Sequence, residues 1–233
     1  MTYLFDPAPQ VALPIAGGEA LFPVHRIYCV GRNYAEHAQE MGHSGREAPF
    51  FFMKPADAVL AGSSEHPSEM PFPPLTSNLH HEVELVVAIG TGGANIAVAD
   101  APLHIAAYAV GLDMTRRDLQ AEAKKQGRPW CIAKGFDHSA PVGPLVLAEQ
   151  VHGLADAAIT LHVNGSLRQS GKISDMIYNI AETIAEISKA WALQAGDLIF
   201  TGTPAGVAAV QRGDLLVAEV DGLPALHVRM GTD

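Results

Sequence analysis

Most apolar residues fall into short runs separated by segments that contain glycine or proline, a pattern typical of a chain built largely from β-strands. Strands are expected over residues 27–30, 49–54, 79–89, 105–112, 159–163, 198–201, 215–220 and 225–228. The strand that ends at Val163 is followed by Asn164-Gly165, a pair that favours a two-residue hairpin turn. A β-hairpin is therefore predicted there.

Helical periodicity is less frequent along the chain. Residues 180–193 carry apolar side chains on one face at spacings of three and four, which predicts an amphipathic helix. Shorter helices are expected over residues 35–41 and 116–125, the second with Thr115 as a cap. Strands outnumber helices and do not alternate with them regularly, so we predict an α+β fold that is mostly β, with a mixed and mainly antiparallel sheet.

Composition and charge narrow the class of protein. Residues 1–23 are rich in Pro, Ala and Gly and are expected to form an N-terminal arm or short strands before one functional domain at 24–233. With 48% hydrophobic residues the chain can bury a sizeable core. Its formal net charge of −10 leaves no basic surface for nucleic acid. No apolar stretch is long enough to span a membrane and no secretion signal is visible, so we expect a soluble, cytoplasmic protein.

The two cysteines, Cys29 and Cys131, form neither a disulfide framework nor a zinc ligand set. Both lie in apolar sequence, and a small buried thiol is therefore expected at each position.

The most informative chemical feature is a pair of glutamates before the apolar run that ends at residue 89. Alternate residues of a strand point to one face roughly 6.6 Å apart, so Glu82 and Glu84 share a face with Val86 and Ala88. Two like charges beside an apolar face repel each other unless a cation lies between them. The pair is a candidate Mg²⁺ site. A solvent-facing strand end with two hydrated glutamates is the alternative.

Asp113 adds a third carboxylate directly after the apolar run 105–112. Like Glu84 it lies where a strand gives way to polar sequence, a position from which a rigid scaffold can present a ligand. Three carboxylates without a Cys or His pair suit Mg²⁺ or Mn²⁺ better than zinc. Taken alone, Asp113 is also compatible with a turn or a helix cap.

Other polar residues suggest catalysis more weakly. His37 and Glu40 are one helical turn apart, so the carboxylate can orient the imidazole as a base, although such pairs are often only surface contacts. Lys134 ends the apolar segment 130–134 and must either reach solvent or meet an anion. The loop 201–206, Thr-Gly-Thr-Pro-Ala-Gly, can bring backbone amides to an anion or can be a plain tight turn.

Five motifs in this order resemble the fumarylacetoacetate hydrolase family. They are Gly31 to His37, His80 to Glu84, Gly111 to Asp118, Ala133 to Asp137 and Thr201 to Gly206. The resemblance extends from about Ile27 to the C-terminus. It implies a mixed β-roll of the type formed by the family's C-terminal domain, a Mg²⁺ or Mn²⁺ cofactor, and in most members a homodimer.

The resemblance also assigns roles residue by residue. It implies that the metal ligands are Glu82, Glu84 and Asp113 and that His37 with Glu40 is the water-activating pair. Lys134 matches the active-site lysine of the family, whereas the positions that match substrate contacts are Arg117, Gln120 and Thr203. Arg32 is expected to add positive charge to the substrate pocket.

Within the family the chain is most similar to short bacterial members that act on acylpyruvates. The implied reaction is metal-dependent hydrolysis of a carbon-carbon bond in a 2,4-dioxo acid, with fumarylpyruvate cleaved to fumarate and pyruvate in gentisate degradation. The same metal and enolate chemistry would also support oxaloacetate decarboxylation or 2-oxo acid isomerisation. A non-catalytic module that binds a divalent metal is the alternative of another class.

Substrate selection is expected to involve a lid. The segment 31–48 contains Gly31, Gly42 and Gly45 around the expected helix and is predicted to close over the substrate. The second carboxylate of fumarylpyruvate needs a cation, for which the expected candidates are Arg116 and the lid residues His43 and Arg46, with a lid residue favoured.

Overall fold

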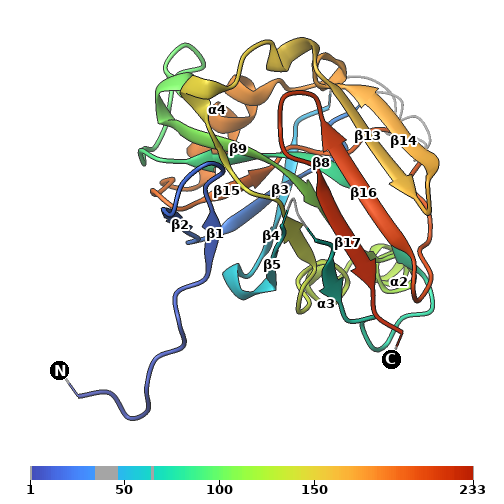
Figure 1. The fold of residues 1–233 in the computed structure, drawn as a ribbon. Coiled ribbons are helices and arrows are strands. Elements are labelled where there is room, and N and C mark those ends of the chain that lie inside the picture. The colour runs from blue at the N-terminus through green and yellow to red at the C-terminus, as the bar shows by residue number, and fades with distance from the viewer. Residues whose placement is uncertain (1, 35–46, 64–65, 233) are drawn as a thin grey trace.

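The computed structural model describes residues 2–34, 47–63 and 66–232. Two sheets dominate the fold. An eight-stranded sheet has the order β4-β3-β15-β8-β9-β11-β5 with β12 paired to β9, and a five-stranded sheet has the order β14-β13-β16-β17-β6 (Figure 1). The prediction of a mostly β fold with mixed sheets is confirmed, because most pairs are antiparallel and three are parallel, namely β3 with β15, β5 with β11 and β6 with β17.

The strands have the following bounds. In the eight-stranded sheet they are β3 (Ile27–Gly31), β4 (Phe50–Lys54), β5 (Val59–Ala61), β8 (Val83–Ile89), β9 (Ile105–Leu112), β11 (Ala140–Val142), β12 (Val146–Leu147) and β15 (Leu198–Phe200). In the five-stranded sheet they are β6 (Ser68–Met70), β13 (Ala158–Val163), β14 (Ser166–Lys172), β16 (Leu215–Val220) and β17 (Leu226–Met230). Two short pairs complete the set, namely β1 (Ala12–Pro14) with β2 (Leu21–Pro23) and β7 (Leu79–His80) with β10 (Thr115–Arg116).

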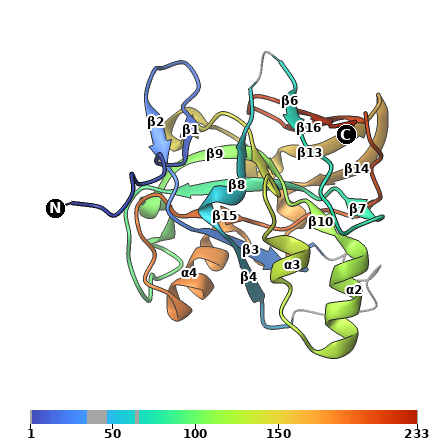
Figure 2. The ribbon, with the colours of Figure 1, turned by 90° about the horizontal axis from the view of Figure 1, so that it is seen from below.

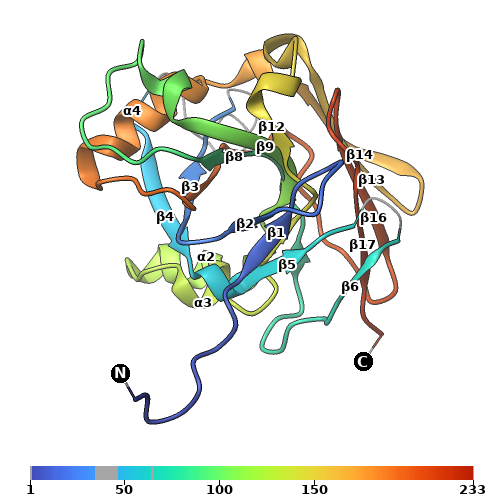
Figure 3. The ribbon, with the colours of Figure 1, turned by 60° about the vertical axis from the view of Figure 1, so that its left-hand side comes forward.

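The core lies on both faces of β8, every residue of which is buried. Toward the five-stranded sheet, Val83 and Leu85 pack in one cluster with apolar residues of β13, β16 and β17. Val86 and Ala88 pack with the β1–β2 hairpin, which lies near β5 (Figure 3). A strand buried on both faces is expected to be continuously apolar, which explains the sequence of this run.

Three helices flank the sheets in the described part of the chain. Helix α4 (Ile180–Ala190) packs apolar side chains against β3, β8 and β15. Helices α2 (Arg117–Gln126) and α3 (Cys131–Lys134) lie side by side near β10 and β4 (Figure 2). Both longer helices begin within a residue of the prediction, but Thr115 is not the cap of α2. It lies in β10, where its Oγ1 donates a hydrogen bond to the Asp113 carbonyl at 3.1 Å.

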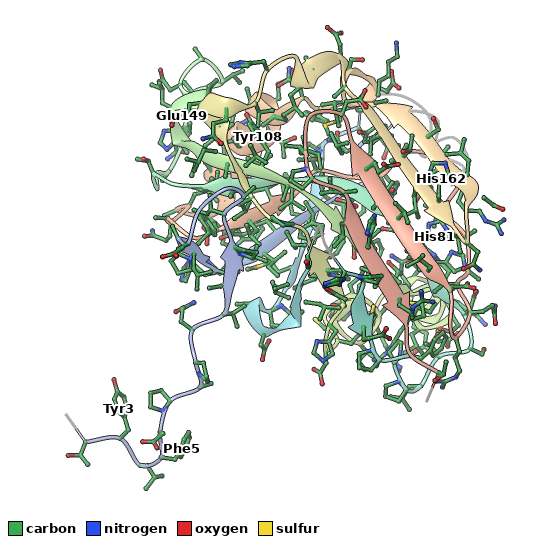
Figure 4. The ribbon with its side chains drawn as sticks, in the orientation of Figure 1. Tyr3, Phe5, His81, Tyr108, Glu149 and His162 are labelled. Atoms are coloured by element: carbon green, nitrogen blue, oxygen red, sulfur yellow. The ribbon has the colours of Figure 1, made fainter. Side chains whose placement is uncertain are left out.

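The predicted hairpin is present and joins β13 to β14. Asn164 and Gly165 have φ values of 51° and 77°, the left-handed conformation that this turn requires at both positions. At the other end of the chain, an extended segment precedes β1, and Tyr3 and Phe5 project from it, 68% and 77% exposed (Figure 4). The division of the chain at residue 24 stays a prediction. No helix in the described ranges is long and apolar enough to cross a membrane.

The N-terminus of α4 provides a test of local stability. The Asn179 side chain accepts a hydrogen bond from the Glu182 N–H at 3.0 Å, and the Glu182 carboxylate accepts one from the Asn179 N–H at 3.0 Å. We expect Asn179→Ala to lower the free energy of unfolding by about 1 kcal/mol. The melting temperature should fall by about 2 to 4 °C, whereas Asn179→Ser, which keeps an acceptor, should lose less. Equal melting temperatures for the two variants would show that the cap contributes nothing.

Candidate metal and substrate site

Three buried carboxylates converge at one end of β8 and β9. Glu82, Glu84 and Asp113 each offer an oxygen atom, and these atoms all lie within 4.8 Å of one another. The residues are only 6%, 2% and 1% exposed. The solvent-facing strand end considered from the sequence is therefore wrong, and Asp113 is more than a turn residue.

Antiparallel pairing explains why residues distant in sequence meet here. Val83 is opposite Leu112 and Glu84 is opposite Gly111, so the residues just beyond these pairs, Glu82 and Asp113, are neighbours. The Asp113 N–H donates to the Glu82 carbonyl at 2.9 Å and extends the ladder by one bond. The backbone register thus brings the acids together before any side-chain contact is considered.

The carboxylates are electrostatically strained by their burial. The pKa of Glu84 is raised well above its usual range, because the side chain is desolvated and because Asp113 and Glu82 add negative charge nearby. One hydrogen bond opposes this shift, donated by the Gly202 N–H to Glu84 Oε2 at 2.7 Å. Three close, oxygen-bearing acids form a donor set that fits a hard divalent cation such as Mg²⁺ or Mn²⁺.

Basic side chains surround the acids. Lys134 Nζ lies 2.7 Å from Glu82 Oε2 and 2.6 Å from Asp113 Oδ2, and Arg117 pairs with the other oxygen of Glu82. Burial lowers the pKa of Lys134, but the Asp113 and Glu82 carboxylates outweigh it, so the pKa is raised overall. Lys134 therefore meets anions rather than reaching solvent, and it stays a protonated donor in the pocket.

Lys54 is a further basic residue of the site that sequence reasoning missed. Its side chain is fully buried, with Nζ 2.9 Å from Asp113 Oδ1. The same ammonium donates to the backbone carbonyls of Met114, at 3.2 Å, and Lys134. Lys54 ends an apolar aromatic strand just as Lys134 ends an apolar segment. The argument that a lysine in such a place must meet an anion therefore applied equally to it.

The Thr-Gly-Thr-Pro-Ala-Gly segment is a loop that closes one side of the site. Thr201 begins it after β15 and binds the Leu85 carbonyl of β8 through its N–H at 3.1 Å and its Oγ1 at 2.8 Å. Gly202 has a φ of 101°, and a Cβ there would lie 2.7 Å from that of Asn33. Glycine is required at this position for both reasons, and it lets the backbone N–H reach Glu84.

Both glutamates and the expected substrate-binding residues line a single pocket. It includes Glu82, Glu84, Arg32, Arg117, Gln120, Lys134 and Thr203. Arg117 Nη1 donates to Gln120 Oε1 at 2.5 Å, which fixes both side chains on the first turn of α2. The Arg32 guanidinium lies 4.8 Å from the centre of the Phe50 ring. The pocket thus combines a carboxylate cluster with several cations and amide donors.

Lys124 also lines this pocket and was not anticipated from the sequence. It lies two helical turns after Arg117 on α2, a spacing that puts both on one face. Burial lowers the pKa of Lys124, and the charges of Arg117 and Arg32 lower it further. Its ammonium lies 5.2 Å from the centre of the Trp130 ring.

Some expected residues are elsewhere or cannot be placed. His37, Glu40, His43 and Arg46 lie outside the described residues, so the water-activating pair and the lid stay predictions. Arg116 points away from the pocket, because its Nη1 donates to the Ile132 carbonyl at 3.1 Å and its guanidinium lies 4.3 Å from the centre of the Phe136 ring. It is therefore a poor candidate for binding the distal carboxylate. Cys131 is exposed, so the expectation of a buried thiol is wrong there and correct only for the other cysteine.

Comparisons with known proteins agree with this geometry. The family model described as fumarylacetoacetate (FAA) hydrolase C-terminal matches residues 26–230. The mitochondrial oxaloacetate tautomerase of Rattus norvegicus is 43% identical over 204 residues, 88% of this chain and 90% of that protein. The mitochondrial oxaloacetate decarboxylase of Dictyostelium discoideum is 37% identical over 198 residues, 85% of this chain and 89% of that protein.

A solved structure matches the whole chain. It is the fumarylpyruvate hydrolase of Pseudomonas aeruginosa in complex with Mn²⁺ and pyruvate. The two sequences are 51% identical, the TM-score is 0.97, and the match covers 100% of this chain and 100% of that chain. The sequence motifs, the curled mixed sheet and the buried carboxylate cluster have one common explanation. The chain belongs to the fumarylacetoacetate hydrolase family.

Proposed function

We propose that the protein hydrolyses a carbon-carbon bond of an acylpyruvate and that its substrate is fumarylpyruvate, cleaved to fumarate and pyruvate. One observation carries the proposal. Glu82, Glu84 and Asp113 form a buried cluster, and its two glutamates line a pocket with a buried lysine and several polar donors, in a chain 51% identical to a fumarylpyruvate hydrolase crystallised with Mn²⁺ and pyruvate.

The acids would hold Mg²⁺ or Mn²⁺, and the ion would supply Lewis acidity for the negative charge that develops on the pyruvate end. Lys134 Nζ already lies within 2.7 Å of two of these carboxylates. It is therefore placed to donate to the same developing charge, with Gln120 as a neutral partner. Arg117 and Arg32 make the pocket locally positive, which favours a dianionic substrate in a protein of net negative charge.

Hydrolysis also needs a base, and His37 with Glu40 remains our proposal for it. His37 would take a proton from water while the hydroxide adds to C4 of the 2,4-dioxo acid. The C3–C4 bond then breaks, and its electron pair passes to the pyruvate enolate. Return of the proton from His37 to C3 completes pyruvate, and the acyl group leaves as the carboxylic acid. Lys134 and Gln120 stabilise the enolate charge until that proton returns.

Oxaloacetate chemistry is the second candidate. The identity of 43% to an oxaloacetate tautomerase and of 37% to an oxaloacetate decarboxylase favours it. Both activities pass through an enolate of a 2-oxo acid and need the same acids and lysine, but no attacking water.

A non-catalytic metal-binding module would give no role to the buried Lys134 or to the fixed Arg117–Gln120 pair. We further propose, on the family resemblance, that the protein works as a homodimer. Its net charge of −10 and short apolar stretches lead us to propose that it is cytoplasmic, without a nucleic-acid or membrane partner.

A substrate comparison tests the proposal directly. Fumarylpyruvate, acetylpyruvate and oxaloacetate should be assayed for pyruvate release or decarboxylation with Mg²⁺ and with Mn²⁺. We expect the highest kcat/KM on fumarylpyruvate, loss of activity after chelation, and recovery when either ion is added back. Full activity of the metal-free protein would contradict the metal requirement, and a preference for oxaloacetate would establish the second candidate instead.

Asp113→Asn tests the metal site. The change removes one anionic ligand and keeps the size of the side chain, so the dissociation constant for Mn²⁺ should rise more than tenfold, as measured by calorimetry. The matched control is Asp118→Asn, because Asp118 lies in the same region but binds Thr76 Oγ1 at 2.7 Å rather than the other acids. Equal Mn²⁺ affinity in the two variants would exclude Asp113 as a ligand.

Lys134→Met separates charge stabilisation from metal binding. Loss of a donor to the developing charge should lower kcat by about 100-fold or more. Mn²⁺ should bind at least as tightly as in the wild type, because a cation that competes for two carboxylates is gone. The control is Lys124→Met, which removes a pocket lysine whose ammonium lies 5.2 Å from the centre of the Trp130 ring. If both variants lose activity equally, Lys134 has no special role in the chemistry.

A further inference from the structure

Gln169 lies in the middle of β14 and is 0% exposed, whereas the other residues of this strand are exposed or half-buried. A β-bulge lies beside it. Leu161 is opposite Gln169 while His162 is opposite Leu167, so Arg168 is an extra residue on β14. A bulge redirects neighbouring side chains. Here the Gln169 side chain reaches inward, away from the five-stranded sheet and toward the strand that carries the glutamates.

All hydrogen-bonding atoms of the Gln169 amide are engaged. Oε1 accepts from the Val83 N–H at 3.1 Å and lies 2.8 Å from His81 Nδ1 (His81 is labelled in Figure 4). Nε2 donates to the Pro204 carbonyl and to Thr203 Oγ1, both at 2.8 Å. A backbone N–H can only donate and a backbone carbonyl can only accept, so these two partners fix which end of the amide is which.

The fixed amide determines the direction of the hydrogen bond at Thr203. Because Gln169 Nε2 donates to Thr203 Oγ1, that hydroxyl must accept from the amide, and its single proton is left for another acceptor. Within residues 2–34, 47–63 and 66–232, the Thr203 hydroxyl donates no hydrogen bond to another group. Thr203 is only 4% exposed and lines the pocket of Glu84 and Lys134. The unused proton is therefore available to a group bound in that pocket.

Close packing keeps the loop and β14 in this register. A Cβ on Gly206 would lie 2.1 Å from the Arg168 carbonyl oxygen, and one on Gly171 would lie 2.9 Å from Cβ of Pro204. The loop backbone therefore rests directly on the bulge of β14. Neither Thr203 nor Gln169 can move independently of the other without loss of this contact.

We infer that Gln169 is a positioning residue that makes Thr203 a dedicated hydrogen-bond donor toward a carboxylate or carbonyl oxygen of the bound 2-oxo acid. The inference rests on the proposed function for the identity of the ligand and adds to it a residue outside the pocket. Gln169 does not line the pocket and acts through Thr203.

Three variants and one probe ligand test the inference. Gln169→Glu keeps an acceptor for Val83 and His81 and, in its ionised form, offers Thr203 an acceptor in place of the donor, so the Thr203 hydroxyl turns its proton toward residue 169. Gln169→Met removes both ends of the amide and leaves that proton free. Thr203→Val removes the hydroxyl itself. The dissociation constant of oxalate is measured by calorimetry on each Mn²⁺-loaded protein, beside that of Mn²⁺ alone and the melting temperature.

We expect Gln169→Glu and Thr203→Val each to weaken oxalate binding about tenfold or more, the effect of losing a hydrogen bond to a charged group. Gln169→Met should weaken it less than about threefold, and Mn²⁺ binding should change less than about threefold in all variants. A merely structural role gives the opposite order, because the Met variant loses all four hydrogen bonds of the amide.

The double variant excludes a simple charge effect. If Gln169→Glu acts through Thr203, adding it to Thr203→Val should weaken oxalate binding by no more than about a further twofold. A full additional loss would mean that the new carboxylate repels oxalate directly and would overturn the inference. So would wild-type affinity in Gln169→Glu, or a greater loss in the Met variant.

Two further comparisons keep the test decisive. If Gln169→Glu does not fold, the test uses Thr203→Ser, which keeps the hydroxyl, together with Gln169→Met. Both must retain oxalate affinity while Thr203→Val loses it, and wild-type affinity in Thr203→Val would refute the inference.

The failure of the proposed function can be told apart from the failure of this inference. If oxalate binding follows the expected order but fumarylpyruvate is not cleaved, the inference stands and the hydrolase proposal falls. If fumarylpyruvate is cleaved while Gln169→Glu binds oxalate normally, only the inference is wrong.

Discussion

Concentrated negative charge at the end of β8 and β9 is the constraint that organises this protein. Buried carboxylates are stable only when cations or donors lie against them, and removal of one partner of a buried ion pair costs about 3 to 5 kcal/mol. Glu82, Glu84 and Asp113 are matched by two lysines, an arginine and a backbone N–H. These partners come from β4, α2, α3 and the loop after β15, so this one requirement ties together distant parts of the chain.

The sheets make that arrangement rigid. Strand β8 is buried on both faces, and β9 and β15 pair with it on either side. The acids therefore project from the ends of two central strands in a packed sheet rather than from a flexible loop. The loop 201–206 is held by Leu85 and Glu84 of β8 on one side and by Gln169 of β14 on the other. Both sheets thus contribute to the walls of one pocket.

Local patterns in the sequence predicted the carboxylate ligands and the hairpin. The contacts that depend on how distant strands pair could not be predicted in this way. The i, i+2 spacing of Glu82 and Glu84 and the place of Asp113 after a strand were visible, and so was the hairpin at Asn164. Lys54 and Gln169 could not be assigned partners, because their contacts are separated by 60 and 34 residues and depend on register between strands. The family motifs placed Arg117, Gln120 and Thr203 in one pocket, and the geometry agrees.

Asn33 connects the loop after β15 to the segment before α4. Its amide donates to the Thr201 and Tyr178 carbonyls at 2.8 and 2.9 Å and accepts from the Tyr178 N–H at 2.8 Å. Tyr34 then forms a bridge with Met176, so the chain enters residues 35–46 from an anchored point. One amide thus holds a wall of the pocket that it does not itself line, and a substitution at Asn33 would loosen the loop beside Glu84 and the segment before α4 together. A residue remote from the reacting groups can in this way alter the pocket through the scaffold alone.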